Sequence, residues 1–262
     1  MKKFRARIYG FLRYQHLFQE LVEKDIKLKY RRSFLGYLWS ILNPLMIMGI
    51  MVVVFSNMFR FDIKSYPVYL IIGQTMFNFV SQSTNEAMWS IIGNAPLLKK
   101  TYVPKYIFTI SKVTSSCVNT LFSLGAMLIV LLVCRVPLNW YMLLIPFIIL
   151  QTYVFSVGMG MLLSAAAVFF RDIQYIYAAF ITAWMYVTPI FYPVQQLPVK
   201  LQWLIKHFNP CYSYITQFRT VVLDADIPDL RLVLYGVLTS VAMLLVGTLF
   251  FERTQDKFIL YI

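Results

Sequence analysis

The chain has 262 residues, of which 60% are hydrophobic and 13% are charged, with a mean hydropathy of +0.67. Soluble domains usually carry about 25% charged residues, so the composition excludes an ordinary soluble protein and predicts a chain that crosses a membrane several times. The net charge of +13 does not indicate nucleic-acid binding, because ten of the 24 Lys and Arg residues precede Trp39, beside the first apolar segment. The three cysteines form no CxxC metal pair.

Residues 14–30 are typical of an amphipathic helix that lies on the membrane surface. Asp25 falls in the middle of its apolar face. This carboxylate either pairs locally with Lys29 or a following Arg, or holds the helix to another cytoplasmic loop. The predicted apolar face consists of Tyr14, Leu17, Phe18, Leu21, Val22 and Leu28.

Six apolar segments follow, each near the roughly 20 residues that span the hydrocarbon. The basic cluster before the first crossing predicts a cytoplasmic N-terminus, and an even number of crossings returns the C-terminus to the same side. We therefore expect one membrane domain at 37–251, between a cytoplasmic N-terminus at 1–36 and a cytoplasmic tail at 252–262. The predicted crossings are 37–58, 66–91, 106–133, 141–169, 173–192 and 230–251.

Between the fifth and sixth crossings, two apolar pieces at 197–208 and 212–223 are separated by Asn209-Pro210. Each is too short to span a bilayer. The pattern favours two re-entrant helices that dip in from the outer face. The alternative is an extracellular loop with two surface helices.

The second crossing carries polar residues at spacings of three and four, which places them on one helix face. Such side chains either hydrogen-bond to neighbouring helices or line a wet passage. They are Gln74, Asn78, Ser81 and Asn85.

The fifth crossing carries an aromatic stripe of Tyr177, Phe180, Trp184 and Phe191. Rings in a membrane helix belong to the core or to an interface belt, or they form a ladder on which the apolar faces of sugars slide. Both interpretations stay open on the sequence pattern.

Other residues in the crossings have packing explanations. Glu86 and Lys112 lie near predicted cytoplasmic ends, where snorkelling accounts for their charges. Small residues four apart on the fourth and sixth crossings predict close helix contacts. These small residues are Ser156, Gly160, Ser164, Gly236 and Ser240.

The loop at 93–106 has Pro96 and Pro104 on either side of a short amphipathic piece. It is either a basic turn that sets topology or a docking element for a cytoplasmic partner. The sequence contains no GxxxxGK[ST], HExxH or GxSxG motif, so we predict no catalytic residue and no metal ligand.

The order and spacing of several short motifs resemble the transmembrane subunits of polysaccharide ABC exporters. This resemblance covers nearly the whole chain. The matching residues are Asp25-Ile-Lys-x-x-Tyr30, Ser33-x-Leu35-Gly36-x-x-Trp39, Asn43-Pro44, Phe170-Arg171-Asp172, Thr188-Pro189-Ile190, Asn209-Pro210 and Gln255-Asp256-Lys257-Phe258.

The resemblance implies an all-α permease of six transmembrane helices, with an N-terminal interface helix and two re-entrant helices. It implies two permease copies working with two ATPase subunits, which hold ATP and Mg²⁺, so no cofactor is expected on this chain. The implied cytoplasmic gate is Arg31, Leu35, Gly36 and Trp39; the implied ATPase-coupling residues are Asp25, Pro96, Leu97, Leu98, Lys99 and Tyr102. The substrate path is assigned to Gln74, Asn78, Ser81, Tyr177, Phe180, Trp184 and Phe191.

The function implied is export of lipid-linked polysaccharide (O-antigen, capsule or teichoic acid) across the cytoplasmic membrane. One alternative is an exporter of the same superfamily for a drug or small lipid. Another is an intramembrane glycan-modifying enzyme, whose candidate carboxylates, Asp62 and those at 224–229, have no convincing partner.

Overall fold

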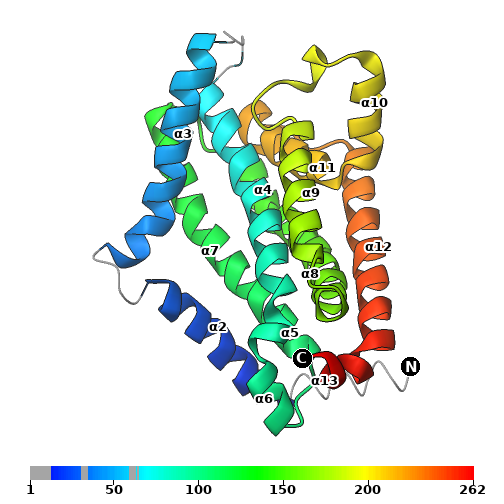
Figure 1. The fold of residues 1–262 in the computed structure, drawn as a ribbon. Helices are drawn as coiled ribbons and strands as arrows, with labels where there is room; N and C mark the ends of the chain where they lie inside the picture. Colours follow the sequence, from blue (N-terminus) through cyan, green and yellow to red (C-terminus); the bar gives the residue numbers. More distant parts are fainter. Residues whose placement is uncertain (1–12, 31–34, 59–62, 64) are drawn as a thin grey trace.

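The computed structural model describes residues 13–30, 35–58, 63 and 65–262, apart from the side chains of 30 and 56–58. Within these ranges every regular secondary-structure element is a helix, and there is no strand (Figure 1). The long helices are α3 (Trp39–Met58), α4 (Tyr66–Met88), α7 (Tyr106–Val133), α8 (Ile145–Phe169), α9 (Ile173–Val187) and α12 (Leu230–Thr254). The all-α fold predicted from the sequence is confirmed.

Four helical segments are long and apolar enough to cross a membrane: 36–55, 106–133, 140–169 and 230–261. Helix α9 is apolar but has only 15 residues. Helix α4 has 23 residues and includes several polar side chains, which make it less apolar than the four segments above. It is buried along most of its length, between α3, α7, α8 and α11. The predicted count of six crossings stays a prediction.

Short elements connect these helices. At one end of the bundle lie the surface helix α2 (Gln15–Tyr30) and the small helices α5, α6 and α13; we call this the α6 end (Figure 1). At the opposite end lies α10, and we call it the α10 end. The short elements are η1 (Gly36–Leu38), α5 (Ser90–Gly93), α6 (Ala95–Lys100), η2 (Trp140–Leu144), η3 (Val194–Gln196), α10 (Val199–Phe208), α11 (Pro210–Arg219), the π-helical turn η4 (Thr220–Asp224), η5 (Gln255–Lys257) and α13 (Phe258–Tyr261).

The surface helix α2 packs against α7 through one face. Leu17, Leu21 and Ile26 are half-buried on this face, whereas Leu28 is 56% exposed. The predicted apolar face was therefore wrong in its last turn. Asp25, in the middle of the predicted apolar face, makes an ion pair described below, and Leu28 in the turn after it stays exposed.

Helix α9 is shorter than the fifth crossing, 173–192, that the apolar pattern predicts. Helix α9 ends at Val187, and Thr188 has extended backbone with ψ of 129°. Pro189 explains this end, since it has no N–H to donate and disfavours a helical residue before it. Phe191 therefore does not continue the aromatic stripe of α9.

The segment between α9 and α12 forms two short helices, as expected, with the break at Asn209. The Asn209 side chain caps α11 by accepting from the Tyr212 N–H at 3.3 Å, and it accepts from Trp184 Nε1 at 2.9 Å. Helix α11 is largely buried between α4, α8 and α12, and its re-entrant path through the membrane stays a prediction. Helix α10 is mostly exposed and buries Ile205.

Arg219, 8% exposed, anchors the end of α11. Its guanidinium donates to the carbonyl oxygens of Pro189, Ile190 and Tyr69 at 2.8, 2.9 and 3.1 Å and lies 3.3 Å from the centroid of the Tyr69 ring. Backbone carbonyl oxygens are strong hydrogen-bond acceptors, and they satisfy the donors of this buried cation. The buried cation therefore holds α4, α11 and the segment that follows α9 together.

Helices α8 and α12 pack through glycines. A Cβ atom on Gly247 would overlap the carbonyl oxygen of Gly158, and one on Gly158 would overlap the backbone of Met243. The sequence pattern did not identify this pair. It did identify Gly160, where a Cβ would come within 2.7 Å of Ala87 Cβ.

These contacts predict the effect of adding a side chain. Gly247→Ala should lower the melting temperature of the detergent-solubilised protein, because overpacking of a well-packed contact costs roughly 1–3 kcal/mol. Gly49→Ala is the matched control, since a Cβ there would meet no atom within 4 Å. Equal melting temperatures for the two variants would contradict the close α8–α12 contact.

Candidate functional site

The α6 end presents a short helix whose neighbouring leucines face opposite ways. Leu98 is 5% exposed and packs in a buried cluster with Phe108 and Phe258. Leu97 is 36% exposed, and Pro96 and Lys99 are also exposed. The sequence predicted one coupling element from both leucines; the structure divides them into one that anchors α6 and one that faces outward.

Helix α2 touches the chain just after α6. Tyr102 is fully exposed as a side chain, and its carbonyl oxygen accepts a hydrogen bond of 3.1 Å from the Tyr14 hydroxyl. The start of α2 is therefore joined to the loop that follows α6. Both predicted coupling segments lie at the same end of the bundle (Figure 1).

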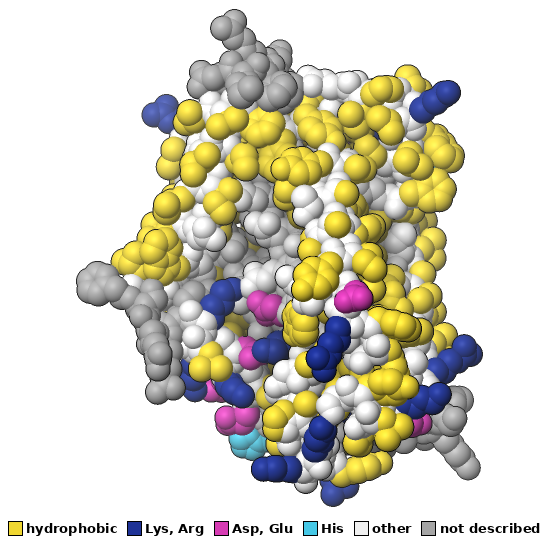
Figure 2. Space-filling model, viewed as in Figure 1, with side chains coloured by type: hydrophobic (Ala, Val, Ile, Leu, Met, Phe, Trp, Pro, Cys, Tyr) yellow, Lys and Arg dark blue, Asp and Glu magenta, His cyan; other side chains and the backbone are white. Residues whose placement is uncertain are grey.

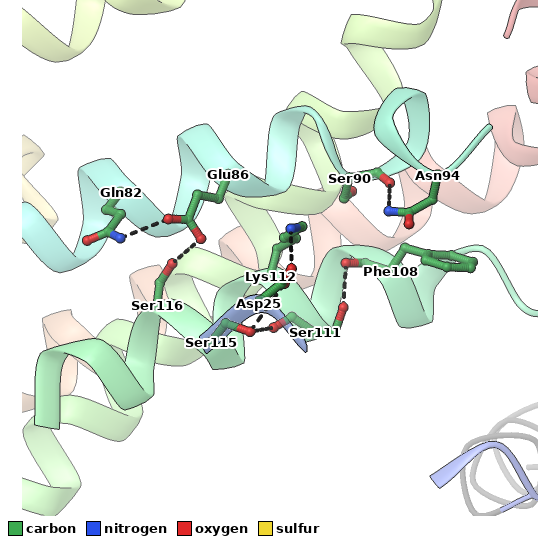
Figure 3. Close-up of polar contacts among 10 residues, drawn as sticks. All are labelled: Asp25, Gln82, Glu86, Ser90, Asn94, Phe108, Ser111, Lys112, Ser115 and Ser116. Atoms are coloured by element: carbon green, nitrogen blue, oxygen red, sulfur yellow. Dashed lines mark hydrogen bonds and ion pairs between the residues drawn. The ribbon is translucent and has the colours of Figure 1, made fainter. Parts of the chain in front are cut away.

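Asp25 pairs with Lys112 of α7 at 2.7 Å (Figure 3). The Asp25 and Lys112 side chains are 18% and 28% exposed, respectively. Ser115 donates to the second carboxylate oxygen of Asp25 at 3.4 Å. The two predicted alternatives for Asp25 were a local ion pair and a contact with a cytoplasmic loop. Both were wrong, because Asp25 pairs with Lys112 of the long helix α7.

Glu86 belongs to the same polar cluster (Figure 3). Its two carboxylate oxygens accept from Gln82 at 2.8 Å and from Ser116 at 3.0 Å. The snorkelling explanation for Glu86 and Lys112 was therefore wrong, because both charges are held by partners on neighbouring helices. On α2, burial lowers the pKa of the Lys29 ammonium, and the negative charge of Glu86 partly opposes this.

A polar groove of about 450 Å³ lies between α3, α4 and α7, next to α2. In the space-filling view the surface is hollowed beside α3, and charged side chains gather between the hollow and the α6 end (Figure 2). The groove is lined by Lys29, Trp39, Ser40, Asn43, Pro44, Asn78, Gln82, Asn119 and Ser123.

The polar residues predicted on the second crossing lie on the less buried face of α4. Asn78 is exposed and lines the groove, and Gln74 and Ser81 are half-buried. Three rings of the predicted aromatic stripe stay in contact along α9, with centroids 6.1 Å apart for Tyr177 and Phe180 and 5.4 Å apart for Phe180 and Trp184, whereas Phe191 lies beyond the end of the helix. The exposure of these rings differs: Tyr177 is buried against Thr84, Phe180 is 48% exposed, Trp184 is half-buried, and Phe191 is buried and stacked on Phe55 at 5.3 Å.

The residues predicted as a cytoplasmic gate lie where α2 leads into α3. Gly36 has a φ of +48°, a left-handed conformation that glycine adopts without strain. Leu35 is half-buried, and Trp39 is 42% exposed and lines the groove. Arg31 lies outside the described residues.

Sequence reasoning missed several groove residues. Gln82 lies four residues after Asn78 on α4, and Asn119 and Ser123 are four apart on α7. The helical period therefore carried a signal on each helix. The helical period does not show that α3, α4 and α7 surround one groove.

Within the described part of the chain, no group of three or more His, Cys, Asp or Glu residues could hold a metal ion. The helical fold and the four segments long and apolar enough to cross a membrane define an all-α, multi-pass membrane protein. A family model described as "ABC-2 type transporter" matches residues 16–223. The chain therefore belongs to the ABC-2 type transporter family.

Relatives match over most of their length. An O-antigen export system permease protein RfbA of Klebsiella pneumoniae is 30% identical over 249 residues, covering 93% of this chain and 95% of the relative. The RfbA protein of Myxococcus xanthus is 28% identical over 246 residues, covering 94% and 95%. A capsule polysaccharide export inner-membrane protein CtrC of Neisseria meningitidis is 22% identical over 236 residues, covering 87% and 86%.

The Asp25–Lys112 pair yields a prediction for stability. Asp25→Asn leaves a half-buried ammonium without its counter-charge, which costs about 1–3 kcal/mol, so the melting temperature of the purified protein should fall. Adding Lys112→Met should recover most of the loss, because removing both partners leaves no uncompensated charge.

The control for this prediction is Glu23→Gln, which breaks the exposed Lys27–Glu23 pair at 2.8 Å and should change little. If Asp25→Asn melted like the wild-type protein, α2 would not depend on this ion pair.

Proposed function

We propose that this chain is the transmembrane subunit of an ATP-driven exporter that moves lipid-linked polysaccharide across the cytoplasmic membrane. The observation that carries the proposal is the near full-length similarity to permeases named for O-antigen and capsule polysaccharide export. Since the sequence has no P-loop, the energy comes from a separate ATPase that binds ATP and Mg²⁺. No relative named above supports the alternative of a drug or small-lipid exporter.

The α6 end is the cytoplasmic face in this proposal. The last helices of the chain, α12 and α13, bring the C-terminus to this end (Figure 1). The basic residues Lys99 and Lys100 of α6 are exposed there, as expected for a loop on the inner side of a membrane. The N-terminal basic segment would lie on the same side.

Helix α6 is the proposed docking element for the ATPase. Its outward residues, Leu97 and the neighbouring Tyr102, offer apolar side chains among exposed lysines. Such a surface fits an apolar pocket with an acidic rim on the partner. Two copies of the permease working with two ATPases complete the proposed assembly.

Side-chain contacts connect α6 to the helices of the bundle. Leu98 of α6 packs in the cluster that contains Phe258 of α13 and Phe108 of α7. Lys105, before α7, donates to the Gln255 carbonyl oxygen at 2.5 Å, and burial lowers the pKa of its ammonium. A displacement of α6 would therefore act on α7 and α13 together.

Leucine substitutions test the docking role. Leu97→Asp should abolish glycan export and prevent the ATPase from co-purifying in mild detergent, while the amount of permease in the membrane stays unchanged. Leu98→Asp should instead reduce folded protein, because it buries a carboxylate in an apolar cluster. The control is Val199→Asp at the α10 end, where the side chain is 80% exposed.

The measurement is surface glycan together with the ATPase recovered per permease. Normal export and normal ATPase recovery in Leu97→Asp would sink the docking assignment. Loss of both in Val199→Asp would show that the assay does not report on α6.

A further inference from the structure

The polar groove has the chemistry of a carbohydrate site. Of its lining residues, Ser40, Asn43, Asn78, Gln82, Asn119 and Ser123 carry neutral polar side chains. Its volume of about 450 Å³ falls in the range of small-ligand sites, roughly 300–1,000 Å³. A cavity of this size lined by amides and hydroxyls favours a ligand that offers many hydrogen-bonding groups.

Two amides that face the groove make no hydrogen bond to other described residues. The side chains of Asn43 and Asn78 are exposed and have no hydrogen-bond partner among the described residues. Each amide group offers two donors and one acceptor. Neighbouring hydroxyl groups of a sugar, each a donor and an acceptor, match this pattern.

Trp39 supplies an apolar surface at the same groove. Its indole is 42% exposed and lies with Asn43, one helical turn further along α3, in the lining. An indole has an apolar face and a polar edge, so it can stack on the C–H face of a sugar ring while amides bind the hydroxyls at the ring's edge.

The charges argue against an anion as the ligand. Lys29 is the one cation among the described lining residues, and the carboxylate of Glu86 acts on it electrostatically. Strong phosphate or carboxylate sites combine several charge-assisted hydrogen bonds, often from arginine. Among the described residues that line the groove, neutral amides outnumber the single ammonium of Lys29, so this lining fits uncharged sugars better than a lipid phosphate.

We infer that this groove binds uncharged sugar residues of the exported glycan, with Asn43 and Asn78 holding hydroxyl groups and Trp39 stacking on a ring. The inference rests on the proposed function and deepens it by locating a glycan subsite beside α2. The predicted substrate path already included residues of α4, and the groove adds substrate contacts from α3 and α7.

Photo-cross-linking tests this subsite in native membranes that contain the full exporter. The photoreactive residue p-benzoylphenylalanine replaces Asn43 or Asn78, and the purified permease is stained for periodate-reactive sugar after illumination. The control position is Leu121, which is 53% exposed on α7 and is absent from the groove lining. We expect sugar-bearing adducts at Asn43 and Asn78 and none at Leu121.

Three results would overturn the inference: adducts that carry only phospholipid, equal sugar adducts at Leu121, or no adduct at the groove positions. Deletion of the chain separates this failure from failure of the proposed function. If deletion abolishes surface glycan and groove positions give no sugar adduct, only the groove assignment falls. If deletion leaves surface glycan unchanged, the exporter proposal itself is wrong.

A substitution pair provides an independent readout. Asn78→Leu should slow export about fivefold, the effect of one lost neutral hydrogen bond, at an unchanged permease level. Asn85→Leu is the matched control, because Asn85 is an exposed amide on the same helix outside the groove lining. Equal slowing by both substitutions would overturn the assignment of Asn78.

Discussion

The ion pair between Asp25 and Lys112 is the interaction on which the α6 end depends. Charges beside hydrocarbon are costly unless they are paired, and this pair satisfies both at 2.7 Å. It attaches α2 to α7 one turn before Lys29, which enters the polar groove. The Tyr14–Tyr102 hydrogen bond attaches the other end of α2 beside α6. One surface helix thereby links the proposed ATPase-docking element to the proposed glycan groove.

The rest of the bundle follows a related constraint. Apolar surface drives helices together only weakly in a membrane, so close packing and hydrogen bonds must do so. The Gly158–Gly247 contact brings α8 against α12, and Arg219 joins three segments through backbone carbonyls. Most buried polar side chains of the described residues form hydrogen bonds within the bundle. Asn43 and Asn78 face an open groove instead, which is why we assign them to a ligand.

Much of the helical architecture could be predicted from the sequence, because apolar length and breakers are local properties. The bounds of α7 agree with the predicted 106–133, and the break at Asn209 was expected from Asn209-Pro210. Helix α9 was predicted too long because its apolar composition continues beyond Thr188, although Pro189 ends the helix. The partner of Asp25 lies 87 residues away, and no helical period indicates which helix packs against α2. The inward direction of Leu98 and the groove between three helices likewise depend on tertiary packing.

Reconstitution tests the central claim of ATP-driven glycan export most directly. The purified permease and its ATPase would be placed in liposomes that contain the lipid-linked glycan, and glycan exposed on the far leaflet would be measured with and without ATP. The account predicts transfer that requires ATP hydrolysis and both subunits. Transfer that proceeds equally without ATP or without the ATPase would contradict it.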